Sequence, residues 1–155
     1  MLNKFVRGII AKIYTELGDE ADNYKYYEDG INQNFQTPCF YPLPLNPQLT
    51  QRVGGRYEYS IPFVVHYFPE DPKDNRDKYE IGDFLLRALG TVVVTTEKLG
   101  ASGEYVGEQI VRGTDIYFTV EEDRVLCRVT YNLLTQLKPN SVDEMDTISV
   151  AENVN

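Results

Sequence analysis

The chain offers few side chains that could act as nucleophiles, bases or metal ligands. Its 155 residues include one histidine, His66, and two cysteines, Cys39 and Cys127. A catalytic thiol–imidazole pair needs a cysteine within hydrogen-bond reach of the histidine, and nothing in this spacing indicates that. One histidine and two unpaired cysteines also cannot build a usual structural zinc site. We therefore predict no catalytic residue, no bound metal and no cofactor.

Adjacent carboxylates are a second source of possible chemistry. They occur at Asp19 and Glu20, at Glu121 and Glu122, and at Asp143 and Glu144. A glycosidase needs two carboxylates that face each other across a cleft, and adjacent residues in polar turns do not indicate one. We interpret these pairs as solvated turn residues.

Two glycine-bearing segments remain. Residues 100–103 lack the Lys-Ser/Thr pair and the following helix of a phosphate-binding loop. Gly54 and Gly55 lie between Arg52 and Arg56, and arginines on an exposed tip can pair with carboxylates or phosphates. We interpret residues 46–56 as a loop or hairpin tip. Its candidate protein–protein interface is Arg52, Gly54, Gly55 and Arg56, and a plain solvated turn is the alternative.

Composition narrows the class of protein. The formal net charge of −9 opposes free-standing binding to nucleic acid, which needs basic residues for the phosphates. No apolar run approaches the length of a membrane helix, and no signal-peptide stretch follows Lys4 and Arg7. Two distant cysteines favour a reducing compartment, although a long-range disulfide stays open. Twelve tyrosines and no tryptophan suit protein–protein surfaces or half-buried strands.

Two amphipathic helices are predicted to position these residues. Apolar side chains recur at three- and four-residue spacing over residues 2–17 and again over residues 76–89. We expect Asn3 to cap the first helix and Gly18 to end it. Asp77 or Asn75 is expected to cap the second, and Gly90 to end it.

The remaining elements are predicted strands. Residues 57–67 alternate clearly, and Pro62 within them suggests an edge position or a bulge. Residues 37–45 hold three prolines and are expected to form an edge strand that becomes a loop. Residues 115–121 and 125–133 are predicted to form a hairpin around an acidic turn. Further strands are predicted at residues 24–28, 91–96 and 105–112.

Helices do not alternate one-for-one with strands, so a doubly wound parallel sheet is not expected. We predict an α+β fold, with an antiparallel-dominated (mixed) β-sheet and two helices packed on one face. Residues 1–138 are expected to form a single domain. Residues 139–155 hold four acids and no basic residue, and they are expected to form an acidic tail that is flexible or docked on a partner.

Several segments together resemble the tail terminator family of phages and prophages of Gram-positive bacteria. The resemblance covers residues 2–138, and its motifs are structural rather than catalytic. They are FVRGIIAKIY at residues 5–14, TPCFY at 37–41, GRYEY at 55–59, VHYFP at 65–69, RGTD at 112–115 and VTYN at 129–132.

The resemblance implies a non-enzymatic protein of the virion. Such a protein forms a ring of six subunits that caps the tail tube, stops its polymerisation and provides the surface for head–tail joining. Its partners would be copies of itself, the tail tube protein and head–tail connector proteins. DNA would only pass through the lumen, and no membrane would be involved. The implied location is the head-proximal end of the tail, and the host cytoplasm during assembly.

Three alternatives stay open. Within virion assembly, another head–tail connector or tail-completion protein has a similar size. Outside it, a small hydrolase with scattered carboxylates or a host regulatory binding protein would fit the composition.

Overall fold

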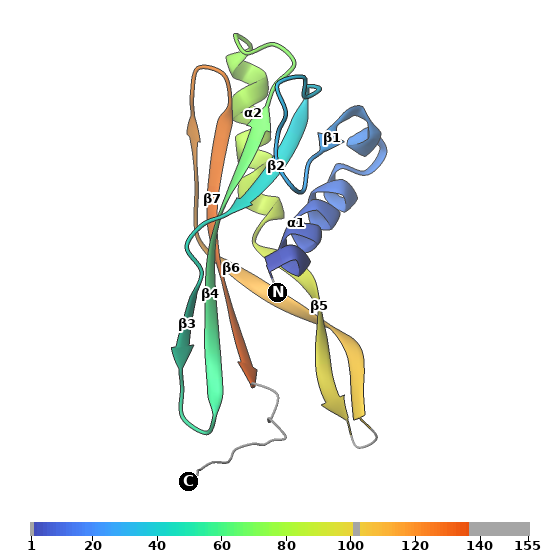
Figure 1. Ribbon diagram of the computed structural model, residues 1–155. Helices are drawn as coiled ribbons and strands as arrows, with labels where there is room; N and C mark the ends of the chain where they lie inside the picture. The colour runs from blue at the N-terminus through green and yellow to red at the C-terminus, as the bar shows by residue number, and fades with distance from the viewer. Residues whose placement is uncertain (1, 101–102, 137–155) are drawn as a thin grey trace.

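The structure is a computed structural model that describes residues 2–100 and 103–136 (Figure 1). Two α-helices and seven strands follow one another, with a short 3-10 helix after the first α-helix. The order is α1 (Leu2–Leu17), the 3-10 helix (Gly18–Asn23), β1 (Lys25–Tyr26), β2 (Cys39–Pro44), β3 (Gln48–Gln51), β4 (Arg56–Phe68), α2 (Asn75–Ala88), β5 (Thr91–Gly100), β6 (Gly103–Val120) and β7 (Val125–Gln136).

The seven strands form one curled sheet in the order β1-β2-β4-β7-β6-β5, and β3 pairs with β4 beyond the end of β2. Every pairing is antiparallel except the two-residue contact between β1 and β2. Both helices lie on one face of the sheet (Figure 1). The predicted fold class is therefore confirmed.

The core lies between that face and the helices. Alternate residues of β4 and β7 point toward the helices, because successive side chains of a strand lie on opposite faces. Burying an aliphatic or aromatic side chain of this size stabilises the fold by roughly 1.5–3 kcal/mol. The fully buried members include Phe5, Ile9 and Ile13 of α1, Leu85 of α2, Phe63, Val65 and Tyr67 of β4, and Cys127, Val129 and Tyr131 of β7.

Pro62 does not mark an edge, as the sequence suggested, because β4 is a central strand between β2/β3 and β7. The carbonyl of Pro62 accepts a hydrogen bond from Leu45 N at 2.8 Å. The position of its missing N–H therefore faces the gap between β2 and β3, where no regular ladder needs a donor. A break in the neighbouring strand, rather than a sheet edge, accommodates this proline.

The ends of the helices confirm some predicted caps and correct others. Gly18 follows α1 with φ 62°, a backbone conformation that favours glycine. Asn3 lies inside the first turn of α1 and is not its cap. The cap of α2 is Asp74, whose side chain accepts a hydrogen bond from Asp77 N at 3.1 Å, so the prediction of Asp77 or Asn75 was wrong.

Strand β6 differs most from the sequence-based expectation. Two separate strands were predicted over residues 105–121, but β6 is one strand that changes partner. Its first half pairs with β5, and from Gly113 onward it pairs with β7. The ladder is irregular between Thr114 and Tyr117, where Asp115 adopts φ 54°. Aspartate tolerates this left-handed conformation better than most residues, so it can occupy the irregularity within the β6–β7 ladder.

Smaller differences concern β1, β2 and β3. The strand predicted over residues 24–28 pairs only at Lys25–Tyr26. Since β1 covers just the start of β2, most of β2 is an edge as predicted, and its prolines Pro42 and Pro44 lie there. Residues 48–51 form β3 rather than a loop.

The predicted loop at residues 100–103 and the tail at 139–155 lie partly or wholly outside the described residues. Neither described helix has the length and hydropathy needed to span a membrane.

Candidate protein interface at the β3–β4 hairpin

The four predicted interface residues meet at the tip of the β3–β4 hairpin. The strands pair through Gln51 opposite Tyr57, and Arg52 N donates to Arg56 O at 2.7 Å. Gly54 and Gly55 close the turn with φ 79° and 73°. Two successive residues with positive φ are strained for any side chain but glycine. The glycines therefore shape the tip, and the arginines flank it.

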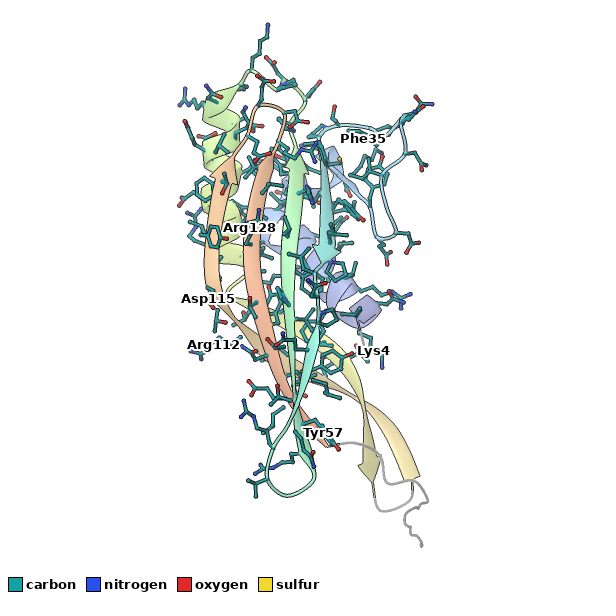
Figure 2. All side chains as sticks on the ribbon, turned by 60° about the vertical axis from the view of Figure 1, so that its left-hand side comes forward. Lys4, Phe35, Tyr57, Arg112, Asp115 and Arg128 are labelled. Atoms are coloured by element: carbon teal, nitrogen blue, oxygen red, sulfur yellow. The ribbon has the colours of Figure 1, made fainter. Side chains whose placement is uncertain are left out.

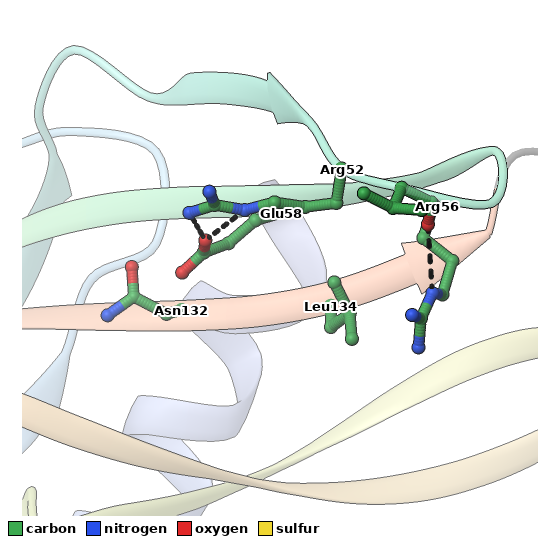
Figure 3. A pocket seen from close by; sticks show the side chains of 6 residues that line it. Arg52, Arg56, Glu58, Asn132 and Leu134 are labelled. Carbon is green, nitrogen blue, oxygen red and sulfur yellow. Dashed lines mark hydrogen bonds and ion pairs between the residues drawn. The ribbon is translucent and has the colours of Figure 1, made fainter.

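The two arginines have different environments (Figure 3). Arg52 forms an ion pair with Glu58, its diagonal neighbour across the hairpin, and Arg52 Nε donates to Glu58 Oε1 at 2.9 Å. Arg56 Nε donates to the Val53 carbonyl at 3.3 Å. Among the described residues Arg56 forms no ion pair with a carboxylate. The tip thus presents one neutralised and one unneutralised guanidinium.

A pocket of about 480 Å³ lies beside the tip on the sheet face away from the helices (Figure 3). Its polar walls offer guanidinium and amide donors, while Val53 and Leu134 are 86% and 49% exposed. The lining residues are Arg52, Val53, Arg56, Glu58, Asn132 and Leu134. The arrangement fits a carboxylate-bearing segment that also carries apolar side chains.

Of the six lining residues, sequence reasoning identified only Arg52 and Arg56. Glu58 could have been placed near Arg52 from a hairpin centred on the glycine pair, since diagonal neighbours lie within reach of long side chains. Asn132 and Leu134 face Ser60 and Glu58 across the β4–β7 ladder. That pairing joins segments far apart in the sequence, and no local pattern specifies it.

The surroundings of the sole histidine, His66, do not favour a nucleophilic pair with Cys39. Cys39 and His66 are diagonal neighbours on the face away from the helices, but burial raises the pKa of the Cys39 thiol to about 11. Burial, together with Arg124 and Arg128, lowers the pKa of His66. Both shifts oppose the thiolate and imidazolium of a nucleophilic pair. Cys39 and Cys127 are free and buried, and β4 separates their strands.

His66 instead belongs to an aromatic row that the sequence pattern did not reveal. Its ring stacks on Tyr41 at 5.7 Å and on Phe68 at 6.1 Å between centroids. The Phe35 ring lies 4.9 Å from the Phe68 ring between centroids, and the Arg124 guanidinium lies 4.7 Å from the centroid of the Phe68 ring. The row lies on the face of the sheet that the helices leave open, which Figure 2 shows from the side of Arg128. It is a packing feature of that face.

The carboxylate pairs lie in turns where the structure describes them. Asp19 and Glu20 are exposed in the 3-10 helix. Glu121 and Glu122 are exposed at the β6–β7 turn, and their backbone carbonyls accept hydrogen bonds from Lys78 Nζ. The third pair lies outside the described residues. Within residues 2–100 and 103–136 no group of three His, Cys, Asp or Glu side chains could hold a metal ion.

A second acidic feature lies around the start of α2. Glu70, Asp71, Asp74 and Asp77 line a pocket together with Tyr67, whose hydroxyl donates to Asp77 Oδ2 at 2.7 Å. Burial and this carboxylate raise the pKa of Tyr67. Most of the described tyrosines are half-buried, while Tyr67 and Tyr131 are buried and Tyr79 and Tyr117 are exposed.

The comparisons with known proteins point to one family. A family model described as "Phage tail terminator protein" matches residues 5–143, which includes α2, every strand and all of α1 except its first three residues. No curated protein matches the chain.

Proposed function

We propose that this chain, which belongs to the phage tail terminator family, forms a ring of six subunits that caps the tail tube and stops its polymerisation. The ring then provides the surface to which head–tail connector proteins join. The observation that carries this proposal is the family match across residues 5–143. The family is one of structural proteins of phage tails, so the chain acts by binding other subunits and not by catalysis.

Open strand edges support assembly with neighbours. The β5–β6 hairpin leaves the body of the sheet (Figure 1), because β6 before Gly113 pairs with β5 and no longer with β7. Among the described residues, the other edge of this half of β6 has no strand partner. Unpaired backbone N–H and C=O groups are templates for another chain. Two such arms per subunit, this hairpin and the β3–β4 hairpin, suit contacts within a ring.

The pocket at the β3–β4 tip supports the role of Arg52, Gly54, Gly55 and Arg56 as an interface. Arginine–carboxylate pairs are strong when a protein neighbour removes them from water. The occupants in an assembled tail would be an adjacent subunit, the tube protein or a connector. The net charge of −9 fits passage of DNA through the lumen, since like charge keeps the phosphates from binding.

This function places the protein at the head-proximal end of the virion tail, and in the host cytoplasm before assembly. A double Arg52→Ala/Arg56→Ala variant tests it. We expect the variant to fold, because exposed substitutions usually change stability by only about 0.5 kcal/mol. Virion yield should fall, and tails of uncontrolled length should accumulate in electron micrographs. The matched control is Arg7→Ala/Arg87→Ala, which removes two exposed arginines of the helices.

Normal tails and normal yield from the Arg52→Ala/Arg56→Ala variant would reject the interface. A deletion of the gene that still yields tails of normal length would reject the terminator function itself.

A further inference from the structure

We propose that, in the free protein, the pocket at the β3–β4 tip is occupied by the acidic segment 139–155 of the same chain. The occupant would cover Arg52 and Arg56 until a neighbour in the tail displaces it. This inference rests on the proposed function, since it concerns how the same interface is kept closed before assembly.

The direction of β7 brings the segment to the pocket. Gln136 is the partner of Arg56 in the β4–β7 ladder, so β7 ends at the hairpin tip. Paired Cα atoms of adjacent strands lie only about 5 Å apart. From Gln136 to Asp143 there are 7 residues, which span up to roughly 3.5 Å each. The first acidic side chains are thus well within reach of both guanidinium groups.

Charge and composition agree with this occupant. The segment carries Asp143, Glu144, Asp146 and Glu152 and no lysine or arginine. The pocket contains Arg56, which has no carboxylate partner among the described residues, and Arg52, which shares only Glu58. Docking of a tethered segment is intramolecular, so it does not carry the entropy cost of bringing two molecules together. Its effective concentration is set by the short linker.

The apolar part of the pocket matches as well. Val53 and Leu134 expose hydrophobic surface next to the two arginines. The acidic segment interleaves its carboxylates with Val142, Met145 and Ile148. A segment that alternates carboxylates and aliphatic side chains can satisfy both kinds of wall at once. The acidic pocket near Asp74, by contrast, would repel it.

The test is paramagnetic relaxation of backbone amides in the full chain. A nitroxide is attached to Ser149→Cys, and it is selective because Cys39 and Cys127 are both 0% exposed. We expect the strongest broadening at amides of residues 52–58. Arg52→Ala/Arg56→Ala should reduce the docked population roughly fivefold, as expected from two exposed charge pairs. Salt of about 1 M, where the Debye length is about 3 Å, should do the same.

Two matched controls separate docking from mere tethering. Arg7→Ala/Arg87→Ala removes the same charge elsewhere and should leave the broadening unchanged. Asp143→Asn, Glu144→Gln, Asp146→Asn and Glu152→Gln keep the tail length and should abolish it. The same spectra report whether each variant is folded. Equal broadening in the Arg52→Ala/Arg56→Ala and Arg7→Ala/Arg87→Ala variants would overturn the proposal. A broadening maximum away from residues 52–58 would do the same.

Intermolecular contact is read from a mixture of isotope-labelled protein and spin-labelled, isotope-free protein. Broadening in that mixture would identify a second copy's tail as the occupant and overturn the assignment to the same chain. The spectra and the tail phenotype are separate readouts, so a failure of this inference can be told apart from a failure of the terminator function. Arg52→Ala/Arg56→Ala can impair tail completion while no tail contact exists, in which case only the present inference fails.

Discussion

Lys78 illustrates how one residue joins distant parts of the chain. It lies on α2, is only 2% exposed, and Nζ donates to the carbonyls of Glu121 and Glu122 at 3.0 and 3.1 Å. A buried ammonium group is tolerated only when its hydrogen bonds are satisfied. Here the backbone of the β6–β7 turn satisfies it, and the lysine in turn fixes that turn against α2.

We expect Lys78→Met to destabilise the protein by about 1.5–3 kcal/mol, because hydrogen bonds to charged groups contribute on that scale. Urea unfolding followed by circular dichroism measures it. Lys73→Met, a change at an exposed lysine before α2, should stay within about 0.5 kcal/mol. A more stable Lys78→Met protein would mean that the desolvation of the ammonium outweighs its two hydrogen bonds.

At the scale of elements, the helices depend on close approaches that only glycine permits. A Cβ at Gly8 of α1 would lie 2.6 Å from the Val93 carbonyl oxygen of β5. That is backbone, which cannot rotate away as a side chain can. Gly8 therefore sets the distance between α1 and the β5 strand that carries one arm of the sheet.

For Gly8→Ala, helix propensity and the close contact with Val93 predict changes in stability of opposite sign. Helix propensity alone predicts that the change stabilises α1 by up to about 1 kcal/mol. The contact with Val93 predicts a loss of at least about 1–3 kcal/mol, because overpacking forces α1 away from the sheet. We expect a loss, measured by thermal unfolding. A higher melting temperature would show that α1 can shift without harm.

Local patterns specified the elements well and their partners poorly. The apolar spacing of residues 2–17 and 76–89 and the alternation of residues 57–67 and 125–133 each correspond to an observed helix or strand. The partner change in β6 at Gly113 and the central place of β4 depend on contacts between distant segments. The candidate site divides in the same way, since the glycine pair indicated the turn but Asn132 and Leu134 come from β7.

At the scale of the whole molecule, several weak acids in the fold have raised pKa values. Burial raises the pKa of Cys39 to about 11 and that of Cys127 to about 12. Burial also raises the pKa of Tyr131 well above that of a free phenol. Between the ordinary and the raised pKa values the folded state holds more protons than the unfolded state. The contribution of these groups to stability is therefore fully present below about pH 9 and is lost as the pH rises through the raised pKa values.

We expect the free energy of unfolding to be level from about pH 7 to 9 and to decline steadily above it. Urea titrations at several pH values measure the slope. Cys127→Ala should make the slope shallower above pH 9, whatever its effect at pH 7, because one raised group is removed. An alkaline slope that is unchanged in Cys127→Ala would contradict the assignment of that thiol.

The pairing of β4 with β7 also constrains how the protein folds during its synthesis. Arg56 and Gln136 are partners although 80 positions separate them. Such non-local pairing loses the entropy of closing a long loop before the stabilising contacts form. Folding is therefore slow compared with that of helical proteins. During synthesis, moreover, β4 must wait for β7, which follows it in the chain. A nascent chain therefore cannot complete the β4–β7 ladder until translation has passed β7, so only chains whose β7 has been made can offer the finished sheet to a partner.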